Sequence, residues 1–276
     1  MLGQKMRPLT TLLCFLACWV FVSSASAQDQ HKMRTMMMAI GADAWIESFA
    51  EGMARSDNPA SAEPDLGWKQ AASEVFKHEE IFDTLVDRMK GMLSDEELDE
   101  ILEFLASDVG RAVTRMEIEA QNPDIADGVD MAGAQIVENL TADEPARLDK
   151  YRDMLAAIDA IESGVTTALN MNFAVLSGMS ASGRMSYSLS EGEILTLLAA
   201  QEDTIREQIG VASLQTAAFT YRDLSDDDLA TYVDFLTSEA GRRLYSVMNG
   251  VADEIMAERG RAFGTRIIEL QGVQEL

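Results

Sequence analysis

The chain has 276 residues and a formal net charge of −25, and hydrophobic residues make up 47% of it. This length allows one large or two small domains with real cores. So negative a chain repels phosphates and anionic lipid surfaces, which disfavours nucleic acid and membrane-surface partners. Few prolines and abundant Ala, Leu, Met and Glu favour helix, so the predicted fold class is all-α.

Residues 1–27 have the three-part layout of a secretory signal peptide. A short positive region precedes the apolar run PLTTLLCFLACWVFVSS, and small residues follow it, so cleavage is expected after Ala27. The run is shorter than the about 20 residues that a spanning helix needs, and no later stretch is long and apolar enough. An uncleaved anchor and a lipid on Cys18 are the alternatives. The predicted localisation is therefore periplasmic or secreted.

Start signals divide the rest of the chain into predicted helices. Pro123 is placed as a first-turn proline that restarts a helix. Thr141 with Glu144, and Ser190 with Glu193, have the spacing of a cap and the acid that supports it. The Ser- and Gly-containing segments 54–67 and 177–186 are predicted loops. The helices are expected near 33–56, 68–91, 95–106, 108–121, 124–138, 142–178, 191–222, 226–237 and 239–271.

One segment occurs twice, as LSDEELDEILEFLASDVGRAV from Leu93 and as LSDDDLATYVDFLTSEAGRRL from Leu224. Nine of the 21 positions are identical and four more exchange Asp for Glu, where chance gives roughly one or two identities. The separation of 131 residues is far above the about 20–50 of solenoid repeats, which indicates duplication of a small domain. We therefore expect a helical bundle of two related halves, 28–139 and 140–276.

Each copy predicts a capped short helix, a sharp corner and a longer helix. A serine stands at the N-cap with an acid three residues on, and two leucines have the spacing of a hydrophobic staple. A second serine is placed to cap the next helix, where a glycine has no side chain to hold the helix axes apart. These structural-motif residues are Leu93, Ser94, Glu97, Leu98, Phe104, Ser107, Gly110 and Arg111, and Leu224, Ser225, Asp228, Leu229, Phe235, Ser238, Gly241 and Arg242.

The repeated motif resembles the signature of the bacterial domain of unknown function 2059 family. The similarity lies in Leu-Ser-Asp-Glu-Glu-Leu from Leu93, then Phe104 to Ser107 and Gly110-Arg111, and again in the copy from Leu224 to Arg242. The family's motif normally has a Phe-Tyr pair, whereas Leu105 and Leu236 hold the second place here. The resemblance implies an exported helical protein without an established activity, and it brings no catalytic residues.

Residues that support catalysis are scarce. His31 and His78 are the only histidines, and no His–Ser–Asp set is evident. His78 has no second histidine one helical turn away, and no acidic cluster has the spacing of a calcium loop. We therefore predict no catalytic, cofactor or metal site. A pair of carboxylates on facing helices is left open as a route to catalysis.

The predicted function is that of an exported, non-enzymatic protein that binds a protein or polypeptide partner, because Met and Leu stripes suit adaptable grooves. The oligomeric state is not predicted. The alternative is a periplasmic protein that binds copper or a small ligand, in a pocket between the halves or at an N-terminal segment. That segment offers imidazole and thioether ligands in His31, Met33, Met36, Met37 and Met38.

A group of arginines near the C-terminus runs against the acidic background. We expect these side chains to complement the negative end of the final helix. An anionic partner is the alternative. The group comprises Arg242, Arg243, Arg259, Arg261 and Arg266.

Overall fold

The computed structural model describes residues 29–55, 66–181 and 189–274. Within these ranges all regular structure is helical and no strand occurs, which confirms the all-α prediction. The predicted signal peptide, residues 56–65 of the first predicted loop and residues 182–186 of the second lie outside the described residues. Residues 177–181 of the second predicted loop are helical, so the loop prediction is wrong for them. A first helix covers 29–39 and is followed by α2 (Ala42–Arg55), α3 (Leu66–Val75), α4 (His78–Met89), α5 (Asp95–Ala106), α6 (Asp108–Ala120), α7 (Pro123–Asp143), α8 (Pro145–Ala157), α9 (Ala160–Ala181), α10 (Glu191–Ala199), α11 (Glu202–Thr220), α12 (Asp226–Thr237) and α13 (Glu239–Gln274).

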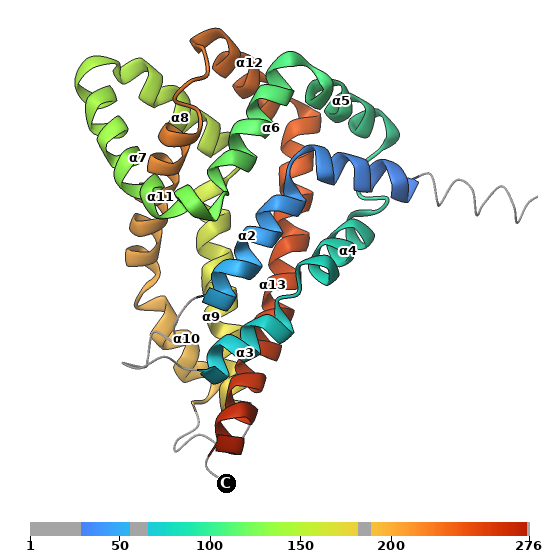
Figure 1. Ribbon diagram of the computed structural model, residues 1–276, viewed down its shortest axis with the longest axis vertical. Helices are drawn as coiled ribbons and strands as arrows, with labels where there is room; N and C mark the ends of the chain where they lie inside the picture. The colour runs from blue at the N-terminus through green and yellow to red at the C-terminus, as the bar shows by residue number, and fades with distance from the viewer. Residues whose placement is uncertain (1–28, 56–65, 182–188, 275–276) are drawn as a thin grey trace, which may run out of the picture.

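The long helix α13 forms the axis of the molecule, and Figure 1 shows it running along the full height of the view. α9 packs along it, and α3 and α4 pack on it from the first half of the chain. α7 packs on α11, while α5, α6 and α12 lie together at one end of the bundle (Figure 1). The core is therefore built from both halves.

Charged pairs join α13 to α3 and α4. Arg266 donates to Glu74 at 2.6 Å, and Arg259 donates to Glu80 at 3.2 Å and to the carbonyl of Val75 at 3.1 Å. The hydrogen bond from Arg266 lowers the pKa of Glu74. Both arginines bind acids of other helices. The last turn of α13 holds no basic residue, so the expectation that the arginine group complements the end of the final helix is wrong.

The predicted N-caps of the repeated segments are present. Ser94 accepts from the amide of Glu97 at 3.2 Å, and the carboxylate of Glu97 accepts from the amide of Ser94 at 2.7 Å. Ser225 likewise accepts from the amide of Asp228 at 3.1 Å, but the Asp228 carboxylate accepts from the Ser225 hydroxyl instead. The shorter Asp side chain thus leaves the second capping box incomplete, since Glu fits this position better.

The corner after each short helix has the same geometry in both copies. Ser107 (φ −70, ψ 166) ends α5 and caps α6, and Ser238 (φ −64, ψ 165) ends α12 and caps α13. Each serine accepts from the amide of the glycine three residues on, Gly110 or Gly241, at 3.0 Å. A Cβ on either glycine would clash with the carbonyl oxygen of Phe104 or Phe235. Only glycine allows the helices to approach this closely.

Several predicted helices are interrupted. Gly41 has φ 76, in the left-handed region that glycine adopts at little cost, and it separates the first helix from α2. Asp159, with φ 52, separates α8 from α9, because Asp also tolerates this conformation. The breaks between α3 and α4 and between α10 and α11 carry no comparable sequence signal. The interrupted predictions are 33–56, 68–91, 142–178 and 191–222.

The predicted helix start at Thr141 is wrong. Thr141 lies inside α7 and donates to the carbonyl of Val137 at 2.7 Å. The break falls at Glu144, which has φ −139 and ψ 60 and makes no side-chain cap. Pro145 explains this position, because proline disfavours helical backbone at the residue before it. α7 therefore runs through the predicted boundary at Leu140, whereas the predicted capping box of Ser190 and Glu193 is present at the start of α10.

Among the described residues, the helices from the first to α6 follow one another as α8 to α13 do, and α7 has no counterpart in the second half. A second pair of matching segments lies at the starts of the two halves. Residues 32–42 (KMRTMMMAIGA) and 150–160 (KYRDMLAAIDA) share six of 11 residues. These segments are 118 residues apart, not 131, so an alignment at the spacing of the first repeat does not reveal the match. Gly41 and Asp159 are at corresponding positions. Lys32 lies 4.0 Å from Asp95, and Lys150 lies 3.7 Å from Asp226, so the corresponding lysines reach corresponding aspartates.

Candidate functional site

The two repeated segments meet directly. Phe104 of α5 and Phe235 of α12 stack face to face, with ring centroids 3.9 Å apart and planes within 3°. They occupy the same position of the two copies. α5 also packs on α13, and α12 packs on α6. Such reciprocal contacts are typical of an interface around a two-fold axis.

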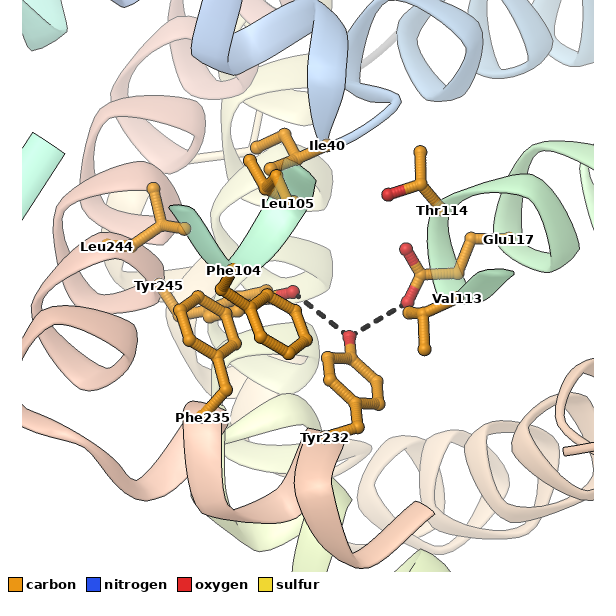
Figure 2. Close-up of a pocket in the computed structure, with 10 residues that line it drawn as sticks. All are labelled: Ile40, Phe104, Leu105, Val113, Thr114, Glu117, Tyr232, Phe235, Leu244 and Tyr245. Carbon is orange, nitrogen blue, oxygen red and sulfur yellow. Dashed lines mark hydrogen bonds between the residues drawn. The ribbon is translucent and has the colours of Figure 1, made fainter. Parts of the chain in front are cut away.

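A carboxyl group and three phenols lie beside this stack, and we call Glu117, Tyr221, Tyr232 and Tyr245 the junction cluster. The hydroxyls of Tyr221 and Tyr232 both donate to Oε1 of Glu117, at 2.5 and 2.8 Å. The Tyr232 and Tyr245 hydroxyls are 3.4 Å apart. Figure 2 shows the Glu117 side chain pointing from α6 toward Tyr232. Glu117 is half-buried as a residue, but its carboxyl end is enclosed by the tyrosines.

Burial governs the acid–base properties of the junction cluster. Burial raises the pKa of Glu117, although the hydrogen bonds from Tyr221 and Tyr232 lower it. Burial and the nearby Glu117 carboxylate also raise the pKa values of Tyr221, Tyr232 and Tyr245. The tyrosines are therefore neutral hydrogen-bond donors at physiological pH.

The cavity at the junction is very small. It measures about 10 Å³ and is lined by Phe104, Phe235, the Glu117 carboxyl and neighbouring apolar side chains (Figure 2). A cavity of this size holds about one water molecule. The junction cluster therefore has no room for a substrate, and the small-ligand pocket predicted between the halves is not formed at this point.

An open groove lies along α6 next to the junction cavity, and we call it the α6 groove. Its volume is about 460 Å³, and Ala39, Leu105, Arg111, Thr114, Arg115 and Ile118 line it. Leu105 and Thr114 also line the junction cavity, so the groove and the junction share a wall. Ile118 is 42% exposed within it. The turn at Gly41 rests against Ile118 and fixes one side of the groove.

Two arginines give the α6 groove a positive edge. Arg111 binds Asp108 on its own helix at 2.6 Å. Arg115, one turn further on, is exposed and forms no ion pair with any described residue. In a chain with a net charge of −25, an apolar surface beside an unpaired arginine suits an occupant with an apolar part and a negative charge.

The proposed copper ligands do not gather on the surface. Met33, Met36 and Met37 of the first helix are at most 1% exposed, and their side chains pack in the hydrophobic core of the protein. Of the described candidates, Met38 and His31 are exposed. Burial of three thioethers removes most of the exposed ligand set on which the copper alternative rests.

His78 has a structural contact. Its Nε2 lies 2.7 Å from Oδ1 of Asp43, which joins the first turn of α4 to that of α2. Among the described residues, no three His, Cys, Asp or Glu side chains gather as metal ligands would. In the same ranges no helix combines the length and apolar character needed to cross a bilayer.

Of the motif residues of the two copies, the structure stacks Phe104 on Phe235, and it adds residues that the sequence does not single out. Of the predicted set, Phe104 and Phe235 lie in the junction and Arg111 lies at the α6 groove. Tyr232 was expected only on the buried stripe of the second repeated segment, and Glu117, Tyr221 and Tyr245 were not predicted. The cluster that they form exists only after folding. Comparisons of the chain with protein-family profiles, curated proteins and solved structures gave no match.

Proposed function

We propose that this chain is an exported, non-enzymatic helical protein that binds a polypeptide partner in the α6 groove. The groove carries this proposal, because it combines an open apolar surface with Arg115, which forms no ion pair within the described part of the chain. Polypeptide segments with apolar and acidic side chains have the chemistry to fill it. The junction cluster is not the proposed binding site, since its cavity of about 10 Å³ admits no substrate.

We also propose that the two halves arose by duplication, and that residues 1–27 direct export. The equal corners at Ser107 and Ser238 support the duplication, as do the corresponding Lys–Asp pairs. Recovery of the chain from the cell envelope with Gln28 as its first residue would support export. The resemblance to the domain of unknown function 2059 family agrees with both proposals and is itself a proposal.

Photo-crosslinking in the producing cell tests the groove. Ile118 is replaced by p-benzoylphenylalanine, and a matched site is made at Val211 on α11, which is also exposed. We expect a crosslinked polypeptide from position 118 and not from position 211. The crosslink should weaken in the Arg115→Glu background and persist in Arg242→Glu, a matched charge reversal at the exposed counterpart of Arg111 in the other copy.

Two outcomes would contradict the proposed function. One is the same set of products from both crosslinking sites, because this indicates contact without a specific groove. The other is the absence of any polypeptide product at position 118. Turnover of a substrate by the purified chain would contradict the non-enzymatic part.

A further inference from the structure

The helices α2 and α9 correspond to each other but are covered differently. Each follows the left-handed residue that ends the helix before it. α13 packs along α9 so closely that a Cβ on Gly178 or Gly264 would clash with the backbone of the other helix. α2 packs on α3 and α4, and no described helix runs along it as α13 runs along α9.

The difference begins where α6 ends. Ile118 of α6 contacts the turn at Gly41, and Asn249, at the corresponding position of α13, donates to the carbonyl of Ile158 at 3.3 Å. α13 then continues along α9. α6 stops at Ala120, and the helix restarted by Pro123 packs on α11 instead. The first half therefore lacks the helix that covers the second.

Trp45 exposes apolar surface on this side of α2, beside Phe49, which is half-buried and packs edge-on against Phe76. We call Trp45, Phe49 and Gly52 the α2 face. Trp45 is 41% exposed and stacks on Phe49 with centroids 6.1 Å apart. Gly52, almost one turn beyond Phe49, has open space where a Cβ would stand. A large exposed aromatic beside a small residue allows a helix backbone to approach closely, as the α9 and α13 glycines do.

The α6 groove supplies the charge at the near end of the α2 face. The turn at Gly41 adjoins both, since it contacts Ile118 and precedes Trp45 by one helical turn. Arg115 lies in the groove without an ion pair to any described residue. An occupant that covers the α2 face therefore meets a positive charge where it reaches α6.

We propose that the partner presents an amphipathic α-helix that lies on the α2 face, in the place that α13 takes on α9, with an acidic side chain at Arg115. The inference rests on the proposed function and specifies its partner. It belongs to the helix-in-groove mode of recognition, in which apolar residues at helical spacing anchor the partner. Trp45 is the expected main anchor, because tryptophan is enriched at such positions.

The test adds a third crosslinking site, with p-benzoylphenylalanine in place of Trp45 in the full chain. Crosslinked peptides from positions 45 and 118 are identified by mass spectrometry, and the segment that they define is synthesised. We expect both sites to label one segment with apolar residues at i, i+3 or i+4 and an acidic residue. That peptide should gain helical circular dichroism on binding, and Arg115→Glu should weaken its binding at least about tenfold.

Each other outcome decides against the helix. If position 45 labels only this chain itself, a segment of the chain covers the α2 face. If position 45 gives no product while position 118 does, or if the peptide binds without gaining helix, the α2 inference fails and the proposed function stands. If the peptide binds the Arg115→Glu and Arg242→Glu variants equally well, the proposed contact between its acidic side chain and Arg115 is wrong. If neither site gives a product, both proposals fail.

Discussion

Glu117 shows how one residue can set a pH dependence. Its carboxyl lies under three tyrosines and accepts two hydrogen bonds from neutral donors. No positively charged side chain of the described residues bonds to it, so within this part of the chain its charged form is desolvated without a counter-ion. Protonation removes the cost of desolvating the charge, although it weakens the two hydrogen bonds from the tyrosines.

Replacing Glu117 by Gln should make the protein more stable than the parent at neutral pH. Burial raises the pKa of Glu117 in the folded state, so the folded state holds this proton more tightly than the unfolded state. The parent therefore loses stability as the pH rises from the unfolded pKa of about 4.5 through the folded pKa. A pKa that differs by one between the folded and unfolded states changes the free energy of unfolding by about 1.4 kcal/mol. Urea unfolding at about pH 4 and about pH 7 measures the change.

Glu193→Gln is the control with the opposite sign. The hydrogen bonds from Ser190 lower the pKa of Glu193, so its charged form stabilises the fold above the unfolded pKa and this contribution is lost as the pH falls through the folded pKa. The Gln variant should be less stable than the parent at neutral pH and should approach it in acid. The buried-carboxyl explanation would be contradicted if the stability of Glu117→Gln relative to the parent were the same at both pH values.

The corners between elements depend on glycine at a close approach. At Gly110 the start of α6 touches the last turn of α5, and Gly241 repeats the contact between α12 and α13. The capping serine and the glycine act together, since the serine accepts from the glycine amide. Together they define the angle at which the Phe-bearing helices enter the junction.

Gly110→Ala should lower the free energy of unfolding by about 3 kcal/mol, because its Cβ meets backbone that has little freedom to move. Gly128→Ala is the matched control within α7, where a Cβ finds open space. That change should be neutral or stabilising by about 0.5–1 kcal/mol, as expected for Ala over Gly in a helix. Chemical denaturation compares the two. Equal effects would show that the corner tolerates a side chain.

At this scale the sequence predicts helix starts better than helix breaks. Ser94, Ser190 and Ser225 carry a local signal, because the cap uses residues within one turn. Thr141 has the same local pattern, yet it lies inside α7 because Pro145 moves the break to Glu144. Asp159 breaks a helix with an ordinary residue in a left-handed conformation, and no short-range pattern distinguishes it from a surface Asp.

At the scale of the whole molecule, the halves are held together by corresponding residues. The stacked ring of Phe104 meets that of Phe235, and hydroxyls from the second half bond to a carboxyl of the first. The sequence predicts that both phenylalanines are important but not that they touch. Their contact follows from how α5, α6, α12 and α13 pack, which depends on the entire fold.

A double-mutant cycle tests the stack. Phe104→Ala and Phe235→Ala should each cost about 2–4 kcal/mol in the free energy of unfolding. Together they should cost about 1 kcal/mol less than the sum, because the second change removes a ring whose partner is already gone. Phe104→Ala combined with Trp68→Ala is the control, since Trp68 packs on Phe263 instead. Full additivity at the stacked pair would contradict direct coupling between the halves.

Because the face-to-face stack joins two parts of one chain, it does not depend on the concentration of the protein. Two separate chains that met through such a contact would come apart as their concentration fell. Here the link through Glu144 keeps the two surfaces in one polypeptide, so their encounter is first order and their effective concentration is set by the tether. The assembled shape therefore persists in a single molecule, however few copies a cell makes.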